Sequence, residues 1–183
     1  MRKVVGVLVA ASLMLPVAAM IGTEAGAATA TTVCKTLTGK QTYTPSLPKL
    51  GVATKVTSTV ASTSKLGGCV GGGVTSATVT ASSKYVGNCT TFVAGFGKPT
   101  KGTATIKWNT GATSSVATTL TSKSKVGQSP VIAVLVTKFT AGLFVGHTST
   151  VTISAVSAGG TKTCISLPLV SFTFKNSGPF KNS

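Results

Sequence analysis

The sequence predicts an all-β protein, an antiparallel β-sandwich or β-barrel of about eight to nine short strands. Thr and Ser are abundant, at 33 and 20 residues, and Thr suits a half-buried pleated surface. Several runs alternate apolar and polar side chains with a period of two, and none after the N-terminal segment has helical periodicity. Glycine and Ser-Lys clusters interrupt these runs roughly every ten residues, a spacing typical of sandwiches and barrels.

The first half of the chain contains four expected strands with an uneven pattern. They cover residues 33–43, 55–62, 74–83 and 90–94. Pro45 and Pro48 mark the first long turn, because proline cannot donate a hydrogen bond to a sheet. The glycine-rich segment 67–73 is expected to be a flexible loop, since it lacks the Gly-Lys-Ser/Thr ending and the helix of a phosphate-binding loop.

The second half alternates more cleanly. In residues 103–109, Ala104, Ile106 and Trp108 share one face, while Thr and Lys occupy the other. Trp108 is therefore predicted to lie in the core. The same pattern recurs in two later segments, residues 150–157 and 170–175.

Two turns and one central strand complete the expected order. Residues 131–136 are apolar on both faces, which predicts a central strand. Residues 109–111 predict a short hairpin before a strand over residues 112–121, because Gly111 can adopt a positive φ. Residues 142–147 are expected to turn the chain into the next strand.

The N-terminus has the pattern of an export signal. Arg2 and Lys3 precede an apolar run over residues 4–21, and small residues with two Ala-x-Ala sites follow. We expect cleavage after Ala27, or alternatively after Ala30.

Residues 1–27 are thus assigned to a signal peptide and residues 28–183 to a single domain. After removal of the signal we expect no membrane span and a protein that is secreted or associated with the cell envelope. Cys34 is not preceded by a lipobox, so a lipid anchor is not expected.

Four cysteines in an exported chain predict two disulfides. The cysteines are Cys34, Cys69, Cys89 and Cys164. Three connectivities are possible, and we favour Cys34–Cys69 with Cys89–Cys164, because each would tie a strand end to a neighbouring loop. The chain has no Cys-x-x-Cys motif and one histidine, His147, so neither a zinc site nor another cofactor is expected.

The order of several short motifs carries a resemblance. The motifs are Gly68-Cys69, Asn88-Cys89, the hairpin over residues 102–114, the segment 136–146 and the late Cys164. In this order they resemble small secreted actinobacterial all-β proteins of unknown function. The resemblance implies an all-β fold with paired cysteines, and it implies no catalytic or binding residue.

The charge excludes most enzymatic chemistry. The chain has 17 Lys and Arg, one acidic residue and a formal charge of +16, and the acid is Glu24 in the signal. A mature chain without carboxylates has neither a carboxylate pair for acid–base catalysis nor an Asp-containing triad. Ser-x-x-Lys matches lack the companion motifs of a Ser/Lys enzyme, so we predict no enzyme. These matches are Ser46/Lys49, Ser62/Lys65 and Ser122/Lys125.

The leading functional hypothesis is an exported structural or interaction module at or outside the cell surface. One alternative is a protein that binds a small molecule or lipid in an apolar interior pocket. That pocket would be lined by Ile106, Trp108, Val134 and Phe172.

A second alternative is weak binding of anionic cell-envelope polymers through lysines. The candidate contacts are Lys98, Lys101, Lys123 and Lys125, two close pairs expected in loops. We expect the lysines to be dispersed over the surface. No specific nucleic-acid recognition is expected, because the mature chain has no Arg for bidentate phosphate contacts.

Export is the first testable prediction. Mass spectrometry of culture medium should find a mature N-terminus at Ala28 or Thr31, since both follow an Ala-x-Ala site. Recovery of only a full-length, membrane-retained chain would contradict the signal-peptide assignment.

Overall fold

The computed structural model describes residues 31–95, 97–124 and 130–183, so the expected signal peptide lies outside the described residues. Eight antiparallel strands form a closed β-barrel, and a ninth short strand is added to it. The all-β prediction is confirmed, and the barrel is the form adopted. The strands are β1 Val33–Leu47, β2 Val56–Val70, β3 Ala77–Gly87, β4 Thr100–Trp108, β5 Thr113–Ser122, β6 Val131–Gly142, β7 Thr148–Ser157, β8 Leu169–Asn176 and β9 Phe180–Lys181.

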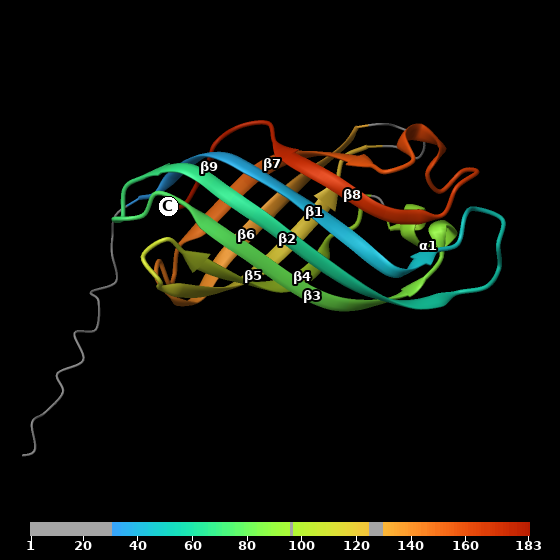
Figure 1. Cartoon of the computed structure of the whole chain (residues 1–183), viewed down its shortest axis with the longest axis horizontal. Helices are drawn as coiled ribbons and strands as arrows, with labels where there is room; N and C mark the ends of the chain where they lie inside the picture. The colour runs from blue at the N-terminus through green and yellow to red at the C-terminus, as the bar shows by residue number, and fades with distance from the viewer. Residues whose placement is uncertain (1–30, 96, 125–129) are drawn as a thin grey trace, which may run out of the picture.

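Strand β1 closes the barrel. The strands follow the order β2-β3-β4-β5-β6-β7-β8-β1, and β1 also pairs with β2 (Figure 1). β1 and β2 each have 15 residues, longer than the short strands expected from the sequence. Gly39 lies on the inner side of this seam, where a Cβ would stand 2.5 Å from the Phe174 ring and from the Ser64 Cβ. A larger residue there would displace the Phe174 ring.

The core fills the barrel at the Cys34–Cys69 end. Trp108, Phe139 and Phe144 are almost fully buried, and the Trp108 and Phe144 rings meet edge-to-face at 5.1 Å. The Trp108 Nε1 donates a hydrogen bond of 2.9 Å to the Ser114 Oγ, so its one polar atom has a partner. The predicted inward face of residues 103–109 and the core position of Trp108 are confirmed.

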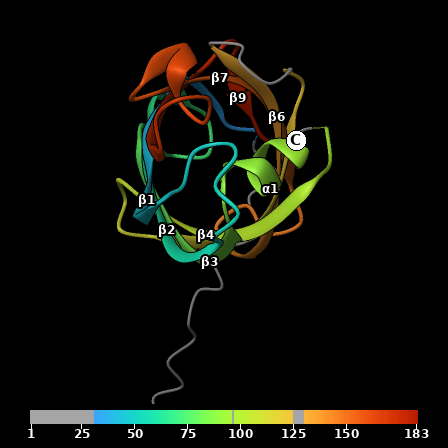
Figure 2. The ribbon, with the colours of Figure 1, turned by 90° about the vertical axis from the view of Figure 1, so that its right-hand side faces the viewer.

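A short helix, α1 (Cys89–Ala94), covers the other end of the barrel (Figure 2). The expected strand over residues 90–94 is therefore wrong. The Asn88 side chain accepts a hydrogen bond from the Thr91 backbone N–H, and the Thr91 hydroxyl accepts one from the Asn88 N–H. This capping box starts a helix despite the β-forming Thr and Val content, and Gly95 ends it.

Both predicted disulfides are present, Cys34–Cys69 and Cys89–Cys164. The first links the paired ends of β1 and β2, and the second ties α1 to the loop before β8. The sequence separations are 35 and 75 residues, which in the chain-entropy estimate correspond to about 3.8 and 4.5 kcal/mol.

The two turns expected from the sequence are confirmed, and the turn expected at Pro45 is wrong. Gly111 has a φ of 87° in the tight turn between β4 and β5, and residues 142–147 turn the chain as expected. Pro45 does not begin the first long turn but lies within β1, where the ladder to β8 shifts register. Residues 131–136 form part of β6, which pairs on both sides, and the outward apolar residues of this strand are half-buried.

Replacing Trp108 by Ala should destabilise the fold by about 3–5 kcal/mol, because a large buried ring is lost and a cavity remains. Urea unfolding followed by far-UV circular dichroism measures this, since Trp108 is the chain's one tryptophan. Val145→Ala, at a 43% exposed turn position, is the control and should change the free energy of unfolding by under about 0.5 kcal/mol. A loss below about 1 kcal/mol for the Trp108 variant would contradict the assigned core.

Candidate anion-binding surface

Lysine and threonine alternate in a row that crosses six neighbouring strands on the outside of the barrel. The backbone register pairs each residue of this row with the next. The row runs through Lys175, Thr38, Lys65, Thr78, Lys107 and Thr113. All six residues are exposed, so three ammonium groups and three hydroxyls face solvent along one line.

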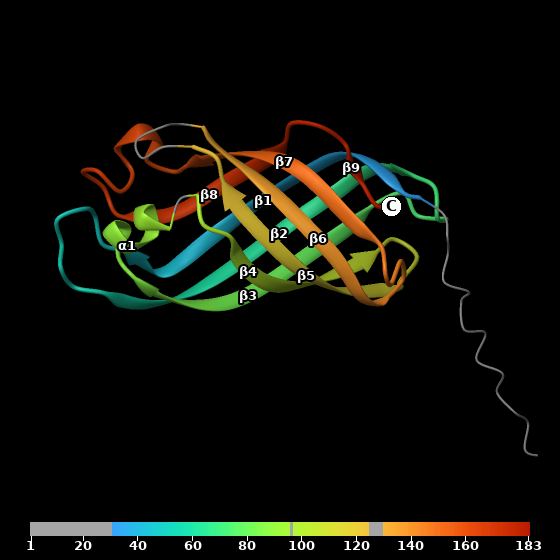
Figure 3. The ribbon, with the colours of Figure 1, turned by 180° about the vertical axis from the view of Figure 1, so that it is seen from behind.

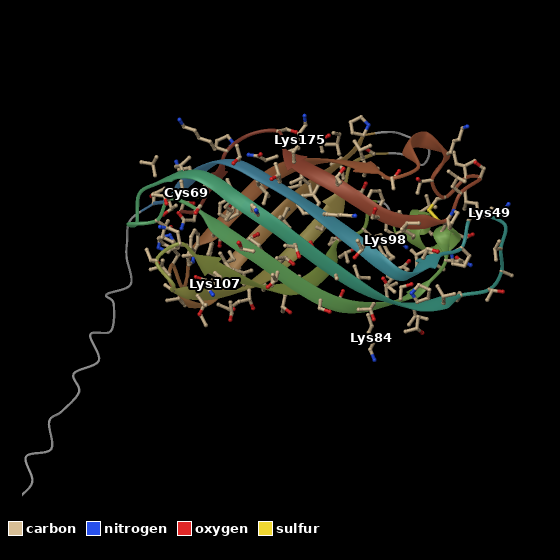
Figure 4. All side chains as sticks on the ribbon, in the orientation of Figure 1. Lys49, Cys69, Lys84, Lys98, Lys107 and Lys175 are labelled. Atoms are coloured by element: carbon tan, nitrogen blue, oxygen red, sulfur yellow. A yellow bond between two sulfur atoms is a disulfide. The ribbon has the colours of Figure 1, made fainter. Side chains whose placement is uncertain are left out.

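A second row lies two residues away along the same strands. It consists of hydroxyl residues and one lysine, all exposed. Its members in strand order are Thr173, Lys40, Thr63, Thr80, Thr105 and Ser115. The two rows together are called the Lys–Thr face below. In Figure 4 the side chains of Lys84 and Lys175 point away from the ribbon of this side of the barrel.

The spacing of the lysines is regular. In the first row one strand separates Lys175 from Lys65, and one separates Lys65 from Lys107. Adjacent strands lie about 4.8 Å apart, so neighbouring lysine backbones in the row are roughly 10 Å apart. No carboxylate side chain is present in residues 31–183, so no lysine here can form an ion pair with a side chain. The face therefore attracts anions from solution.

The opposite wall differs in charge. It is formed by β6 and β7, which Figure 3 shows in front together with β5, the last strand of the Lys–Thr face. β5 and β7 contain no lysine, and β6 contains one, Lys138. Outward positions here include Ile132, Val134 and Val136, each half-buried. Seven of the nine lysines in the described strands thus lie on β1, β2, β3, β4 and β8, and the other two are Lys138 of β6 and Lys181 of β9.

The lysines predicted from sequence proximity are only partly in place. Lys101 lies on the outer side of β4, opposite Thr119, and is not in a loop as expected. Lys98 lies in the loop after α1, and Lys123 follows the end of β5. Lys125 is outside the described residues. The lysines of the two rows were missed because strand neighbours far apart in sequence bring them together, although period-two patterning already placed Lys107 and Lys175 outward.

The expected interior pocket is not formed by the residues named for it. Ile106 and Trp108 belong to the filled core, while Phe172 packs near the α1 end. Val134 lies on the outer side of β6, since the buried residues of that strand, Ala133, Thr137 and Phe139, alternate with it. These four side chains do not line one common cavity.

Two further kinds of candidate site, a Ser/Lys dyad in β2 and a metal site, can be checked against the described residues. Ser62 and Lys65 point to opposite sides of β2, so they do not form a dyad. Within the described ranges, no three His, Cys, Asp or Glu side chains cluster for a metal. His147 is half-buried beside the Phe144 ring, at 6.2 Å between centroids.

Tyr43 lies in an aromatic cluster under α1. Its ring meets those of Tyr85 and Phe92 edge-to-face at 6.4 and 6.1 Å. Burial raises the pKa of the Tyr43 hydroxyl well above its usual value, and a hydrogen bond from Gln41 opposes this rise only in part. Tyr43 is therefore a neutral packing group near neutral pH.

Comparisons with protein-family models, with curated proteins and with solved structures each gave no match for this chain. In the part of the chain that the structure describes, no helix is long and apolar enough to cross a membrane.

Removing the charge of the Lys–Thr face should not destabilise the barrel. We expect Lys40→Gln, Lys65→Gln, Lys107→Gln and Lys175→Gln combined to keep or raise the free energy of unfolding at low salt. Two unit charges about 10 Å apart repel by about 0.4 kcal/mol in water, and salt screens this repulsion. Chemical unfolding at low and high salt measures the effect, and a loss above about 1 kcal/mol would reveal unrecognised stabilising contacts.

Proposed function

We propose that this protein is an exported, non-enzymatic interaction module that binds acidic polysaccharides of the cell envelope through the Lys–Thr face. The observation that carries the proposal is the alignment of Lys175, Lys65 and Lys107 in one exposed row, with Lys40 in the next. A linear polyanion laid across the strands would meet an ammonium group roughly every 10 Å.

Binding would gain from the release of counterions. With no side-chain carboxylate in residues 31–183, the lysines hold only mobile anions, which a polyanion displaces when it binds. Threonine hydroxyls between the lysines can donate and accept hydrogen bonds, which matches the hydroxyl groups of a sugar chain.

A polysaccharide fits this surface better than a nucleic acid. Binding of single-stranded nucleic acid commonly uses aromatic side chains on which bases stack. Among the described residues, every Phe, Tyr and Trp is buried or half-buried. The Lys–Thr face itself contains no aromatic residue and no Arg, which is the residue suited to bidentate phosphate recognition.

Export and the absence of catalysis belong to the same proposal. Two disulfides suit an oxidising compartment outside the cytoplasm. The lack of side-chain carboxylates in residues 31–183, and the placement of Ser62 and Lys65 on opposite sides of β2, support a binding role.

Heparin chromatography of the mature protein tests the polymer-binding role. The face variant combines Lys→Gln changes at Lys40, Lys65, Lys107 and Lys175. We expect it to elute at clearly lower salt than the native protein, because each lost contact lowers the salt dependence of binding by roughly one in a log–log plot.

The matched control removes the same charge elsewhere. It combines Lys→Gln changes at four exposed positions outside the β-strands, Lys49, Lys55, Lys123 and Lys162. Its elution should change much less. Equal shifts in elution for both variants would contradict a specialised binding face and indicate attraction by lysines dispersed over the surface. Stronger retention on single-stranded DNA than on heparin would favour a nucleic acid as the bound polymer.

A further inference from the structure

An open pocket of about 340 Å³ lies on the outside of the barrel, across β3, β4, β5 and β6. Its volume is at the lower end of the range for small-molecule sites. It forms where β3 and β4 part: their ladder pairs Ala77–Thr80 with Thr105–Trp108 and goes no further. Ala81 and Ala104, the next residues on each strand, both line the pocket.

Hydroxyl groups dominate the pocket lining. Six of the lining residues carry one: Thr80, Ser82, Thr103, Thr105, Ser115 and Thr140. The Thr140 Oγ1 donates to the Ser115 carbonyl at 3.0 Å. Within the described residues, the structure shows no side-chain hydrogen bond for the other five, so their hydroxyls are available to a ligand.

Four lysines from β3, β4 and β6 surround the pocket. Lys84 follows Ser82 by two residues, Lys101 precedes Thr103 by two, Lys107 follows Thr105 by two and Lys138 precedes Thr140 by two. Residues two apart on a strand point to the same side and lie about 7 Å apart. All four lysines are exposed, so flexible ammonium groups can reach over the rim.

We infer that this pocket is the subsite that seats one acidic sugar unit of the bound polymer. The hydroxyl lining suits the hydroxyl groups of the sugar ring, and the surrounding lysines suit its anionic group. The pocket includes Thr80, Thr105 and Ser115 of the second row, so a chain that follows the Lys–Thr face passes over it. This inference rests on the proposed polymer binding and adds the recognition of sugar to it.

The test removes pocket hydroxyls and keeps every charge. The pocket variant is Thr80→Val with Thr105→Val, and the matched control is Thr150→Val with Thr152→Val, two exposed threonines of β7 outside the Lys–Thr face and outside the pocket lining. Titration calorimetry at low salt measures two probes, a galacturonic acid tetrasaccharide and a linear polyphosphate of equal charge. Two lost hydrogen bonds correspond to about a tenfold loss of affinity.

We expect the pocket variant to bind the tetrasaccharide about tenfold more weakly than the native protein and to bind polyphosphate unchanged. The control variant should bind both probes as the native protein does. An unchanged affinity of the pocket variant for the tetrasaccharide, or equal losses in both variants, would overturn the subsite. Native protein that is retained on heparin but binds the two probes equally would also overturn it, whereas a lack of retention on heparin would refute the proposed function itself.

Discussion

The pairing of β1 with both β2 and β8 is the constraint on which the rest of the structure depends. It closes the barrel, and its register decides which side chains face out. Thr38 stands between Lys175 and Lys65 across this seam, so both rows of the Lys–Thr face cross it. A slip of one residue would turn the lysines of one strand inward. The filled interior opposes such a slip, because Phe174 occupies the space that Gly39 leaves and charged side chains are costly to bury.

Residues 31–183, which contain lysines and no side-chain carboxylate, depend on solvent to balance their charge. Ion pairs cannot relieve the repulsion between lysines, so regular separation and salt do this: their spacing of roughly 10 Å slightly exceeds the screening length of about 8 Å at physiological salt. The interior uses neutral partners instead, as in the hydrogen bond from Trp108 to Ser114. The separation that weakens the repulsion between lysines also leaves each ammonium group accessible to an external anion.

The alternation of apolar and polar residues predicted which face of a strand is buried. It did not predict which strands become neighbours. The alternation around Ile106 and Trp108 was enough to place one face of β4 in the core. Which strands become neighbours depends on long-range closure, and therefore the alignment of Lys65 with Lys107 could not be predicted from period two alone. The helix α1 was missed for a different reason. Its β-forming composition outweighed a signal that was present, namely the spacing of Asn88 and Thr91 that forms the capping box.

The pocket forms because β3 and β4 are held in different directions: β3 leads to α1, whereas β4 stays paired with β5. β3 has to end at α1, which the Cys89–Cys164 disulfide and a hydrogen bond from the Cys89 N–H to the Pro48 carbonyl hold over the barrel end. β4 instead stays paired with β5 from Thr100 onward, so it cannot follow β3. The ladder between β3 and β4 therefore stops after four pairs, and Gly102, which faces inward by register, is exposed. Where a barrel wall opens in this way, backbone and hydroxyl groups that a neighbouring strand would have covered remain accessible to water or to a ligand. The helix and its disulfide thus shape the pocket from outside its lining, by preventing the wall from closing.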